Sequence, residues 1–197
     1  MIGIVDSGSG NLRSLCNGLR RCGAEPAILQ EPPSVAPEML FLPGVGAFGH
    51  AARALQDRGW YEAIPAFLRA GSRLVGICLG MQLLFETSEE SPGARGLCLI
   101  PGYVRRLDPG QDKVPHIGWA RLNFIRPQAV GPDWAYFVHS YAAQPQDVSC
   151  VEAFADHGPS PFPAVVRSGP VVGVQFHPEK SHGPGIAYLA SLMGGEP

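Results

Sequence analysis

The sequence predicts an α/β fold, with a mostly parallel central sheet flanked by helices and extended by added antiparallel strands. Three observations lead to this prediction. Short apolar runs alternate with helical patterns as far as Glu90, the connections between them are short and rich in Gly and Pro, and the later segments look like strands with a single further helix. Alternating strands and helices are typical of a parallel sheet that is covered on both faces.

The first half opens with a short buried strand over residues 1–6. The turn Ser7-Gly8-Ser9-Gly10 follows, and Asn11 is then a good N-cap for a helix that Gly23 ends. Further along we expect strands at Pro26–Leu29, Met39–Leu42 and Arg73–Ile77, with helices over about 47–56 and 61–70.

The second half is dominated by strands separated by Pro and Gly. They are expected over about 98–107, 116–125, 135–140, 149–155, 163–167 and 171–176, with one helix over about 184–193 and surface loops at Pro127–Asp133 and Ala143–Asp147. Because no linker, repeat or low-complexity tract interrupts the pattern, we expect residues 1–197 to form a single domain.

Composition excludes several classes of protein. The 197 residues are 45% hydrophobic and 16% charged with a net charge of −2, which argues against disorder and leaves no basic patch for nucleic acid or a membrane surface. No apolar run approaches the roughly 20 residues that cross a bilayer, and the start of the chain has no basic segment or cleavage site. We therefore expect a soluble, cytoplasmic protein that uses neither nucleic acid nor membrane as a partner.

The cysteines and glycines exclude further classes of site. Five cysteines without CxxC spacing favour reduced thiols over a disulfide scaffold or zinc module. Gly8-Ser9-Gly10 fails as a dinucleotide fingerprint because Arg13 stands where a third Gly is needed. We expect no metal and no cofactor. Packing is the default role of the cysteines away from the predicted site, which are Cys16, Cys22, Cys98 and Cys150.

Gly76-Ile77-Cys78-Leu79-Gly80 is the strongest local signal of chemistry. It follows a buried strand and opens a helical pattern that reaches Glu86. This is the layout of a nucleophile elbow with Cys in place of Ser, in which flanking glycines remove the Cβ atoms that would clash in the tight turn. A helix N-terminus beneath the thiol would favour the thiolate. The alternative is a buried structural cysteine in a Gly-rich turn.

A second segment supplies a base. The apolar strand that starts at Val171 ends at His177-Pro178-Glu179. In an extended chain residues two apart face the same side, so His177 and Glu179 can project together. A carboxylate beside an imidazole fixes its tautomer and stabilises its protonated form, as a general base serving a nucleophile requires. Taken singly, the two residues could be a core histidine and a solvated charge.

The third segment is Leu42-Pro43-Gly44-Val45-Gly46-Ala47-Phe48, a strand that runs into a Gly-rich turn before a helix. Acyl transfer needs N–H groups directed at the developing oxyanion. We expect one from Leu79, directly after the nucleophile, and a second from the backbone of Gly44 and Val45. The alternative is an ordinary turn between strand and helix.

Together these motifs resemble the class I glutamine amidotransferases, whose Cys-His-Glu triads release ammonia from glutamine. Within that class the chain is similar to the glutaminase subunits of imidazole glycerol phosphate synthase. That similarity is carried by Asp6–Asn11, Gly44–Phe48, Lys113–Trp119, Tyr136–Tyr141 and Glu179–Ser181, which run from one end of the chain to the other.

The resemblance implies a flavodoxin-like fold and a role for each matching residue. Cys78 would attack the carboxamide of L-glutamine, His177 would pass the proton to the departing ammonia, and Glu179 would orient His177. Water would then hydrolyse the thioester. The positions that hold the substrate in the family are Gly46, Gln82, Glu90, Ser140 and Tyr141.

The resemblance also implies a partner. The family works as a heterodimer with a (β/α)8-barrel cyclase that consumes the ammonia and makes imidazole glycerol phosphate and an aminoimidazole carboxamide ribotide. The positions that face this partner match Asn11, Trp119, Tyr136 and Lys180. In the family glutaminase activity is low until the partner binds its ligand, which indicates the loop at Gly44–Gly46 as the switch.

The chain departs from the family pattern at Ser7, Ser9 and Ala120, which leaves the triad intact but puts the details of the partner contact in doubt. Two other functions stay open. One is a class I amidotransferase, or a stand-alone cysteine hydrolase, that serves another reaction. The other is a regulatory binding module that has lost catalysis.

Overall fold

The computed structural model describes residues 1–8, 10–108, 110, 112–125 and 131–194. Ser9 and most of the expected loop Pro127–Asp133 therefore lie outside the described residues. The described residues form a large sheet with the strand order β2-β1-β3-β4-β12-β11-β10-β7-β8 and a small sheet with the order β5-β6-β9.

The large sheet is built from β1 (Ile2–Val5), β2 (Ala27–Leu29), β3 (Met39–Gly44), β4 (Arg73–Cys78), β7 (His116–Phe124), β8 (Trp134–His139), β10 (Val151–His157), β11 (Ser160–Ser168) and β12 (Val171–Val174). The small sheet consists of β5 (Thr87–Ser88), β6 (Gly102–Arg106) and β9 (Tyr141–Pro145). The helices are α1 (Leu12–Arg21), α2 (Phe48–Asp57), α3 (Trp60–Arg69), α4 (Leu79–Gln82) and α5 (His182–Gly194), with the 3₁₀ turns η1 (Val148–Cys150) and η2 (Pro178–Lys180).

The large sheet changes character at β12. From β2 to β12 the neighbouring strands are parallel, whereas from β12 to β8 they are antiparallel. The expected fold class is therefore confirmed, including the antiparallel strands that the second half adds to the same sheet. Because β12 lies beside β4, the chain that leaves β12 runs past the carboxyl end of β4, where Cys78 lies.

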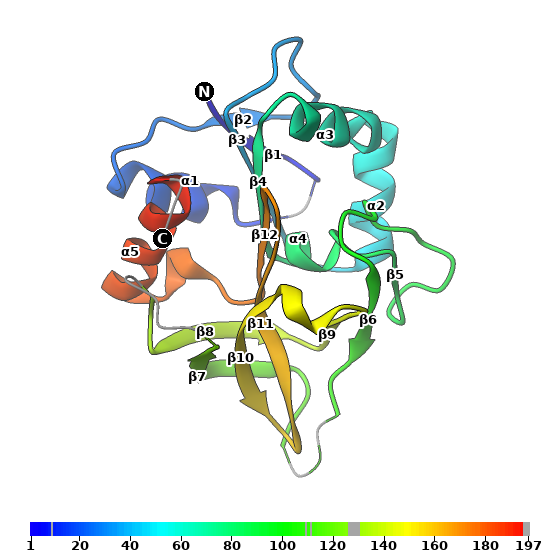
Figure 1. The fold of residues 1–197 in the computed structure, drawn as a ribbon, viewed down its shortest axis with the longest axis vertical. Helices are drawn as coiled ribbons and strands as arrows, with labels where there is room; N and C mark the ends of the chain where they lie inside the picture. Colours follow the sequence, from blue (N-terminus) through cyan, green and yellow to red (C-terminus); the bar gives the residue numbers. More distant parts are fainter. Residues whose placement is uncertain (9, 109, 111, 126–130, 195–197) are drawn as a thin grey trace.

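Helices cover both faces of the parallel part (Figure 1). On one face α1 and α5 contribute Leu15, Leu19 and Leu189 to a buried cluster, and on the other α2 and α3 bury Phe48 and Trp60. Each of these side chains is fully or almost fully buried, which stabilises the fold by roughly 1.5–3 kcal/mol apiece. The two cores hold the central strands, and hence the ends of β3, β4 and β12, in fixed positions.

Local signals set two helix boundaries, of which the cap at Asn11 was predicted from the sequence. The Asn11 side chain accepts a hydrogen bond from the Ser14 N–H at 3.2 Å, so it caps α1. Gly59, with a φ of +76°, separates α2 from α3.

The helix expected from Leu79 to Glu86 is wrong in its length, because α4 ends at Gln82. The carbonyls of Leu83 and Leu84 accept hydrogen bonds from the N–H groups of Leu97 and Leu99, at 2.7 and 2.8 Å. Tertiary hydrogen bonds thus replace the helical ones. Cys78 stands at the start of a single helical turn, so a helix dipole supports its thiolate less than the expected long helix would.

The surface loop expected at Ala143–Asp147 is also wrong. Its first residues belong to β9, which pairs with β6 in the small sheet, and Ala143 is fully buried. Pro145 made the sequence look like a loop rather than a strand. The strand tolerates this proline because it lies at the strand end, opposite Gly102. The strand expected over 98–107 is shorter than predicted, since β6 begins at Gly102.

No helix in the described part of the chain is long and apolar enough to cross a membrane.

Candidate active site at the carboxyl end of β4

Cys78 occupies the tight turn between β4 and α4, with φ +55° and ψ −110°. A Cβ on Gly80 would lie 1.7 Å from the Leu42 carbonyl oxygen, and one on Gly76 would lie 2.6 Å from the Gly80 carbonyl oxygen. Only glycine fits at both positions, and a positive φ is strained for cysteine. The elbow geometry predicted for this motif is confirmed.

His177 and Glu179 lie side by side, with His177 Nδ1 3.0 Å from Glu179 Oε1. Both side chains are 4% exposed, so this ion pair is shielded from water. The expected pairing is therefore confirmed, but the reason given for it was wrong. Residues 178–180 form a 3₁₀ turn rather than a continued strand, and the turn brings the carboxylate back to the imidazole.

The surroundings of His177 favour its charged form. Burial lowers the pKa of its imidazole, but the charges of Cys78 and Glu179, together with the hydrogen bond to Glu179, outweigh burial and raise the pKa to about 10. The ring nitrogen Nε2 is buried and has no hydrogen-bond partner within the described residues. His177 can therefore hold a proton on the side where the thiol lies.

The backbone of His177 is tied to β8. Its N–H donates to the Tyr136 carbonyl at 3.0 Å, and its carbonyl accepts from the Ser181 hydroxyl at 2.7 Å. The Tyr136 N–H in turn donates to Ser181 Oγ at 3.0 Å. This closed ring of hydrogen bonds fixes the imidazole relative to the sheet.

A cavity of about 280 Å³ opens beside the thiol, at the small end of the range for ligand pockets. All five residues expected to hold the substrate line it. The lining consists of Val45, Gly46, Cys78, Leu79, Gln82, Glu90, Pro115, Val138, His139, Ser140 and Tyr141.

Glu90 reaches this cavity from the loop after β5. Its Oε2 accepts the N–H of Phe48 at 2.7 Å, and the Ser91 hydroxyl accepts the N–H of Gly49 at 3.0 Å. These contacts cap the N-terminus of α2. Glu90 therefore stabilises the N-terminus of α2 and also lines the cavity.

The Gly-rich turn lies opposite the nucleophile. Gly44 is the last residue of β3 and pairs with Cys78, while Val45 and Gly46 line the cavity. Gly46 has a φ of +94°, and a Cβ there would meet no heavy atom of the described residues within 4 Å. The turn is therefore open at Gly46, whereas a Cβ on Gly44 would lie 3.1 Å from Leu79 Cβ.

A buried polar network lies behind the cavity and was not foreseen. Gln82 Nε2 donates to the Tyr141 carbonyl at 2.8 Å and to Gln175 Oε1 at 3.1 Å, and Gln175 Nε2 donates to Cys78 Sγ at 3.7 Å. His139 Nδ1 also bonds the Tyr141 carbonyl, at 2.9 Å. The signal in the sequence was a polar Gln175 at the end of an otherwise apolar strand.

His139 is also paired with a second histidine. Its Nε2 lies 3.3 Å from Nδ1 of His116. Burial lowers the pKa of His139 to about 3 and that of His116 to about 4. Both rings are therefore neutral at physiological pH, in contrast to His177.

The residues expected to face a partner lie on neighbouring elements. Trp119 and Tyr136 pair across β7 and β8, with ring centroids 6.0 Å apart, and Trp119 is 43% exposed. Trp119 also stacks on His182 at 5.0 Å, a contact that the sequence did not indicate. Lys180 lies in η2, and Asn11 is exposed at the start of α1, which packs against η2.

Two of the departures, Ser7 and Ala120, are at buried positions. Ser7 is fully buried, and Ala120 is 8% exposed with its side chain in the core on the opposite side of β7 from Trp119. Ser9 lies outside the described residues.

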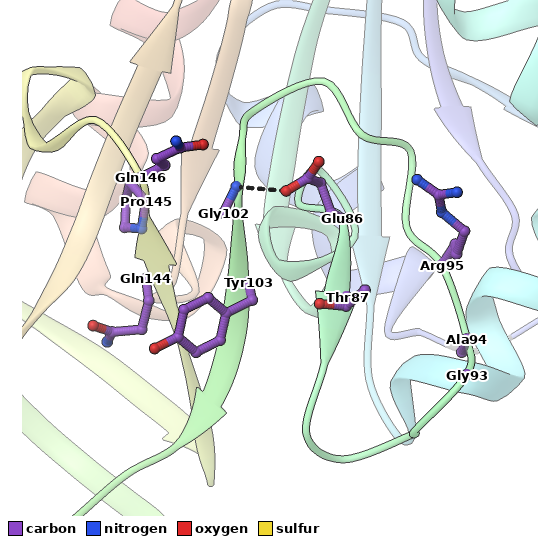
Figure 2. Close-up of a pocket in the computed structure, with 10 residues that line it drawn as sticks. All are labelled: Glu86, Thr87, Gly93, Ala94, Arg95, Gly102, Tyr103, Gln144, Pro145 and Gln146. Carbon is purple, nitrogen blue, oxygen red and sulfur yellow. Dashed lines mark hydrogen bonds between the residues drawn. The ribbon is translucent and has the colours of Figure 1, made fainter.

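A larger hollow of about 790 Å³ lies on the small sheet, away from Cys78 (Figure 2). Tyr103 and Gln144 are cross-strand neighbours on one side of it and Arg95 lies on the other, while Glu86 Oε2 accepts the Gly102 N–H at 3.1 Å. Its lining has no cysteine or histidine, whereas the smaller cavity is lined by Cys78 and by the expected substrate residues and is therefore the candidate active site. No group of three or more His, Cys, Asp or Glu side chains in the described ranges is placed to hold a metal ion.

Comparison with known proteins agrees with this geometry. Residues 3–192 match the family model for class I glutamine amidotransferases. The subunit HisH of imidazole glycerol phosphate synthase from Desulfitobacterium hafniense (strain DSM 10664 / DCB-2) is 43% identical over 98% of this chain and 93% of its own length. HisH from Methanothermobacter thermautotrophicus is 42% identical over 98% of each chain.

Solved structures with low sequence identity share the fold. A crystal structure of a glutamine amidotransferase superposes with a TM-score of 0.79 at 20% identity, covering 98% of both chains. The PurLQS structure from Thermotoga maritima gives a TM-score of 0.76 at 19% identity, covering 98% of this chain and 97% of that one.

Proposed function

The chain belongs to the class I glutamine amidotransferases, among the HisH subunits of imidazole glycerol phosphate synthase, and on this premise we propose that it hydrolyses L-glutamine to glutamate and ammonia for histidine biosynthesis. The observation that carries the proposal is the buried His177–Glu179 pair, 3.0 Å apart, beside the thiol of Cys78. A nucleophile, a base and a carboxylate that orients the base are the parts that acyl transfer through a thioester requires.

The first step is attack of Cys78 Sγ on the carboxamide carbon of glutamine. The C–S bond forms from the thiolate and the carbonyl electrons move to oxygen, while His177 already holds the proton of the thiol. The raised pKa of His177, about 10, supports this starting state because Glu179 stabilises the imidazolium.

The tetrahedral intermediate carries its negative charge on the former carbonyl oxygen. We assign its stabilisation to the N–H of Leu79 and to backbone N–H groups of Gly44 and Val45. The support is their location, since Leu79 and Val45 line the cavity and Gly44 pairs with Cys78.

Collapse of the intermediate breaks the C–N bond, and His177 gives its proton to the departing nitrogen, so that ammonia leaves. Water then attacks the thioester while His177 accepts its proton. The C–S bond breaks to leave the thiolate, His177 keeps the proton taken from water, and glutamate is released with the Cys78–His177 pair regenerated.

The substrate would be held by Gly46, Gln82, Glu90, Ser140 and Tyr141, all of which line the cavity. Both N–H bonds of Gln82 are used within the protein, so its Oε1 is the atom left for the substrate, as an acceptor for an N–H group. Glu90 uses Oε2 to cap α2, which leaves Oε1 to accept from the substrate ammonium.

We further propose that this activity is one half of a heterodimer with a (β/α)8-barrel cyclase, which receives the ammonia. The face that would meet it carries Asn11, Trp119, Tyr136 and Lys180. Its exposed indole supports this assignment because aromatic side chains are common anchors at interfaces. Residues 1–197 would act as a single domain, as their shared central sheet supports.

The partner would control the rate through the turn at Gly44–Gly46. The open space around Gly46 supports a backbone that changes orientation when the partner binds its ligand. Full activity of the isolated chain would contradict this control.

The test is glutamate release from glutamine by the chain alone and mixed with a cyclase subunit and its nucleotide ligand, with Cys78→Ser as control. We expect hydrolysis only in the liganded mixture and none with Cys78→Ser. Equal activity without a partner would contradict the subunit role, and no activity in any mixture would contradict the glutaminase. Loss of folding in Cys78→Ser would favour a structural cysteine.

A further inference from the structure

Gln175 follows β12 directly and its side chain is fully buried. A buried amide is costly unless its polar atoms are satisfied. Its Oε1 accepts from Gln82 Nε2 at 3.1 Å, and its Nε2 lies 3.7 Å from Sγ of Cys78, within the range of a hydrogen bond to sulfur. The sulfur of the nucleophile is thus the acceptor that satisfies this amide.

The direction of these hydrogen bonds is fixed by the network. The chain of bonds starts at the Tyr141 carbonyl, which can only accept, and Gln82 must therefore turn its nitrogen toward it. The same nitrogen donates its second hydrogen to Gln175, which must turn its oxygen toward Gln82. Gln175 is left with its N–H group directed at sulfur, because a flipped Gln175 amide would set nitrogen against nitrogen at Gln82.

An N–H donor favours the ionised form of the acceptor, because hydrogen bonds to charged groups are stronger than those to neutral ones. We propose that Gln175 holds the Cys78 sulfur in its ionised, reactive form, with Gln82 and the Tyr141 carbonyl setting the direction of the amide. The inference rests on the proposed glutaminase for its biological purpose, but its chemistry concerns the thiol alone.

Other groups around the sulfur act with or against Gln175. His177, paired with Glu179, has a raised pKa and is positively charged, so it favours a negative sulfur. His139 is neutral and adds no charge. The Glu90 carboxylate lines the same cavity and the Val138 carbonyl lies 3.8 Å from Sγ, and both disfavour a negative sulfur. Gln175 is an uncharged donor that offsets them without competing for the proton that His177 must carry.

The experiment is the pH dependence of Cys78 alkylation by iodoacetamide, followed by peptide mass mapping so that the other four cysteines do not interfere. Gln175→Met keeps the length of the side chain and removes the donor. We expect the midpoint at which Cys78 becomes reactive to rise by about one pH unit or more, since a hydrogen bond to a charged group is worth about that much.

Val174→Ala is the matched control. It truncates a fully buried neighbour in the same strand and removes no hydrogen bond to sulfur, so it should lower thermal stability while leaving the midpoint unchanged. An unchanged midpoint in folded Gln175→Met would overturn the proposal, and so would an equal shift in Val174→Ala.

A second measurement needs no substitution at residue 175. In the unaltered chain the side-chain amide signals of Gln175, observed by NMR, should move with the same midpoint as Cys78 alkylation. Signals that do not respond to ionisation of Cys78 would overturn the inference even if Gln175→Met does not fold.

These outcomes are separable from those of the proposed function. A chain that hydrolyses glutamine but shows neither the shifted midpoint nor the responding amide contradicts only the role of Gln175. A chain that shows both effects yet hydrolyses no glutamine in any mixture contradicts only the glutaminase.

Discussion

His177 and His139 both lie near Cys78 and are both buried, yet they are held in opposite charge states. Burial lowers the pKa of each, but Cys78 and Glu179 reverse this effect at His177 and raise its pKa to about 10. At His139 the hydrogen-bond partners are a carbonyl and a second imidazole, and the pKa falls to about 3.

The partner of a buried imidazole, rather than its burial, therefore decides whether the ring carries a proton at neutral pH. His177 can store a proton at neutral pH and pass it to a leaving group. His139 is a neutral hydrogen-bond donor that fixes the Tyr141 carbonyl at the base of the cavity. His177 is therefore arranged to transfer a proton, whereas His139 is arranged to position the Tyr141 carbonyl.

Removing the charged imidazole is expected to give the largest loss of glutamine hydrolysis. His177→Asn should lower glutamine hydrolysis in the liganded complex by about 10³–10⁴-fold, since it removes the group that holds the proton of Cys78 and passes it to the leaving nitrogen. Rates of glutamate release measure this loss.

His139→Asn is the matched control, because it keeps a side-chain amide that can donate to Tyr141. We expect it to cost no more than about tenfold, the equivalent of one modest contact. Losses of similar size in the two variants would show that the two histidines do not differ in role.

The next largest effect comes from removing the carboxylate while keeping the shape. Glu179→Gln should reduce hydrolysis by about 10²–10³-fold, because it removes the negative charge that stabilises the imidazolium. The pKa of His177 should fall in parallel, which a pH profile of the rate would record.

Glu152→Gln provides a control for the loss of a paired carboxylate elsewhere. Glu152 binds Arg167 at 2.5 Å in a partly exposed pair, so its change should leave the rate and its pH profile unaltered. A normal profile in Glu179→Gln would contradict the assignment of the pair to proton transfer.

The two sites also predict opposite effects of pH on stability. His177 binds its proton more tightly when folded, so its contribution is complete below about pH 6.5 and is lost as the pH rises toward its folded pKa of about 10. His116 and His139 resist protonation when folded. Their contribution is complete above about pH 6.5 and is lost as the pH falls toward their folded pKa values of about 4 and about 3.

Each contribution is on the order of a few kcal/mol. Thermal unfolding across the pH range should show that His177→Asn flattens the alkaline limb alone and that His139→Phe flattens the acid limb alone. A change on the same limb in both variants would contradict the opposite charge states.

The smallest expected effect on hydrolysis comes from displacing Glu179 without substituting it. A Cβ on Gly18 in α1 would lie 3.1 Å from Glu179 Cβ and 3.2 Å from Leu189 Cδ2. Gly18→Ala should therefore displace the carboxylate and reduce hydrolysis by about tenfold, while crowding offsets the roughly 1 kcal/mol that alanine adds to helix stability.

Gly183→Ala in α5 is the control, since a Cβ there meets nothing within 4 Å among the described residues. It should leave the rate unchanged. Equal rates for Gly18→Ala and the unaltered chain would show that α1 does not position Glu179.

The sequence predicted the part of the site that depends on local geometry. The glycines around Cys78 indicate the elbow because a tight turn has few solutions, and the spacing of His177 and Glu179 indicates their contact. That contact forms through a 3₁₀ turn rather than the expected strand, because the chain leaves the sheet at Pro178.

What the sequence did not predict depends on contacts distant in the chain. The end of α4 is set by hydrogen bonds from Leu97 and Leu99, and β9 exists because β6 pairs with it. The contact of Gln175 with Cys78 spans 97 residues, and its direction is fixed from Tyr141. No periodicity or spacing encodes such a network.

The most direct test of the contrast between the two histidines is an NMR titration of the ring nitrogens of His177 and His139 in the unaltered chain. We predict that the His177 ring stays protonated through neutral pH and loses its proton near pH 10, while the His139 ring stays neutral until well below pH 5. A neutral His177 ring at neutral pH, or a His139 ring that titrates with it, would contradict the account.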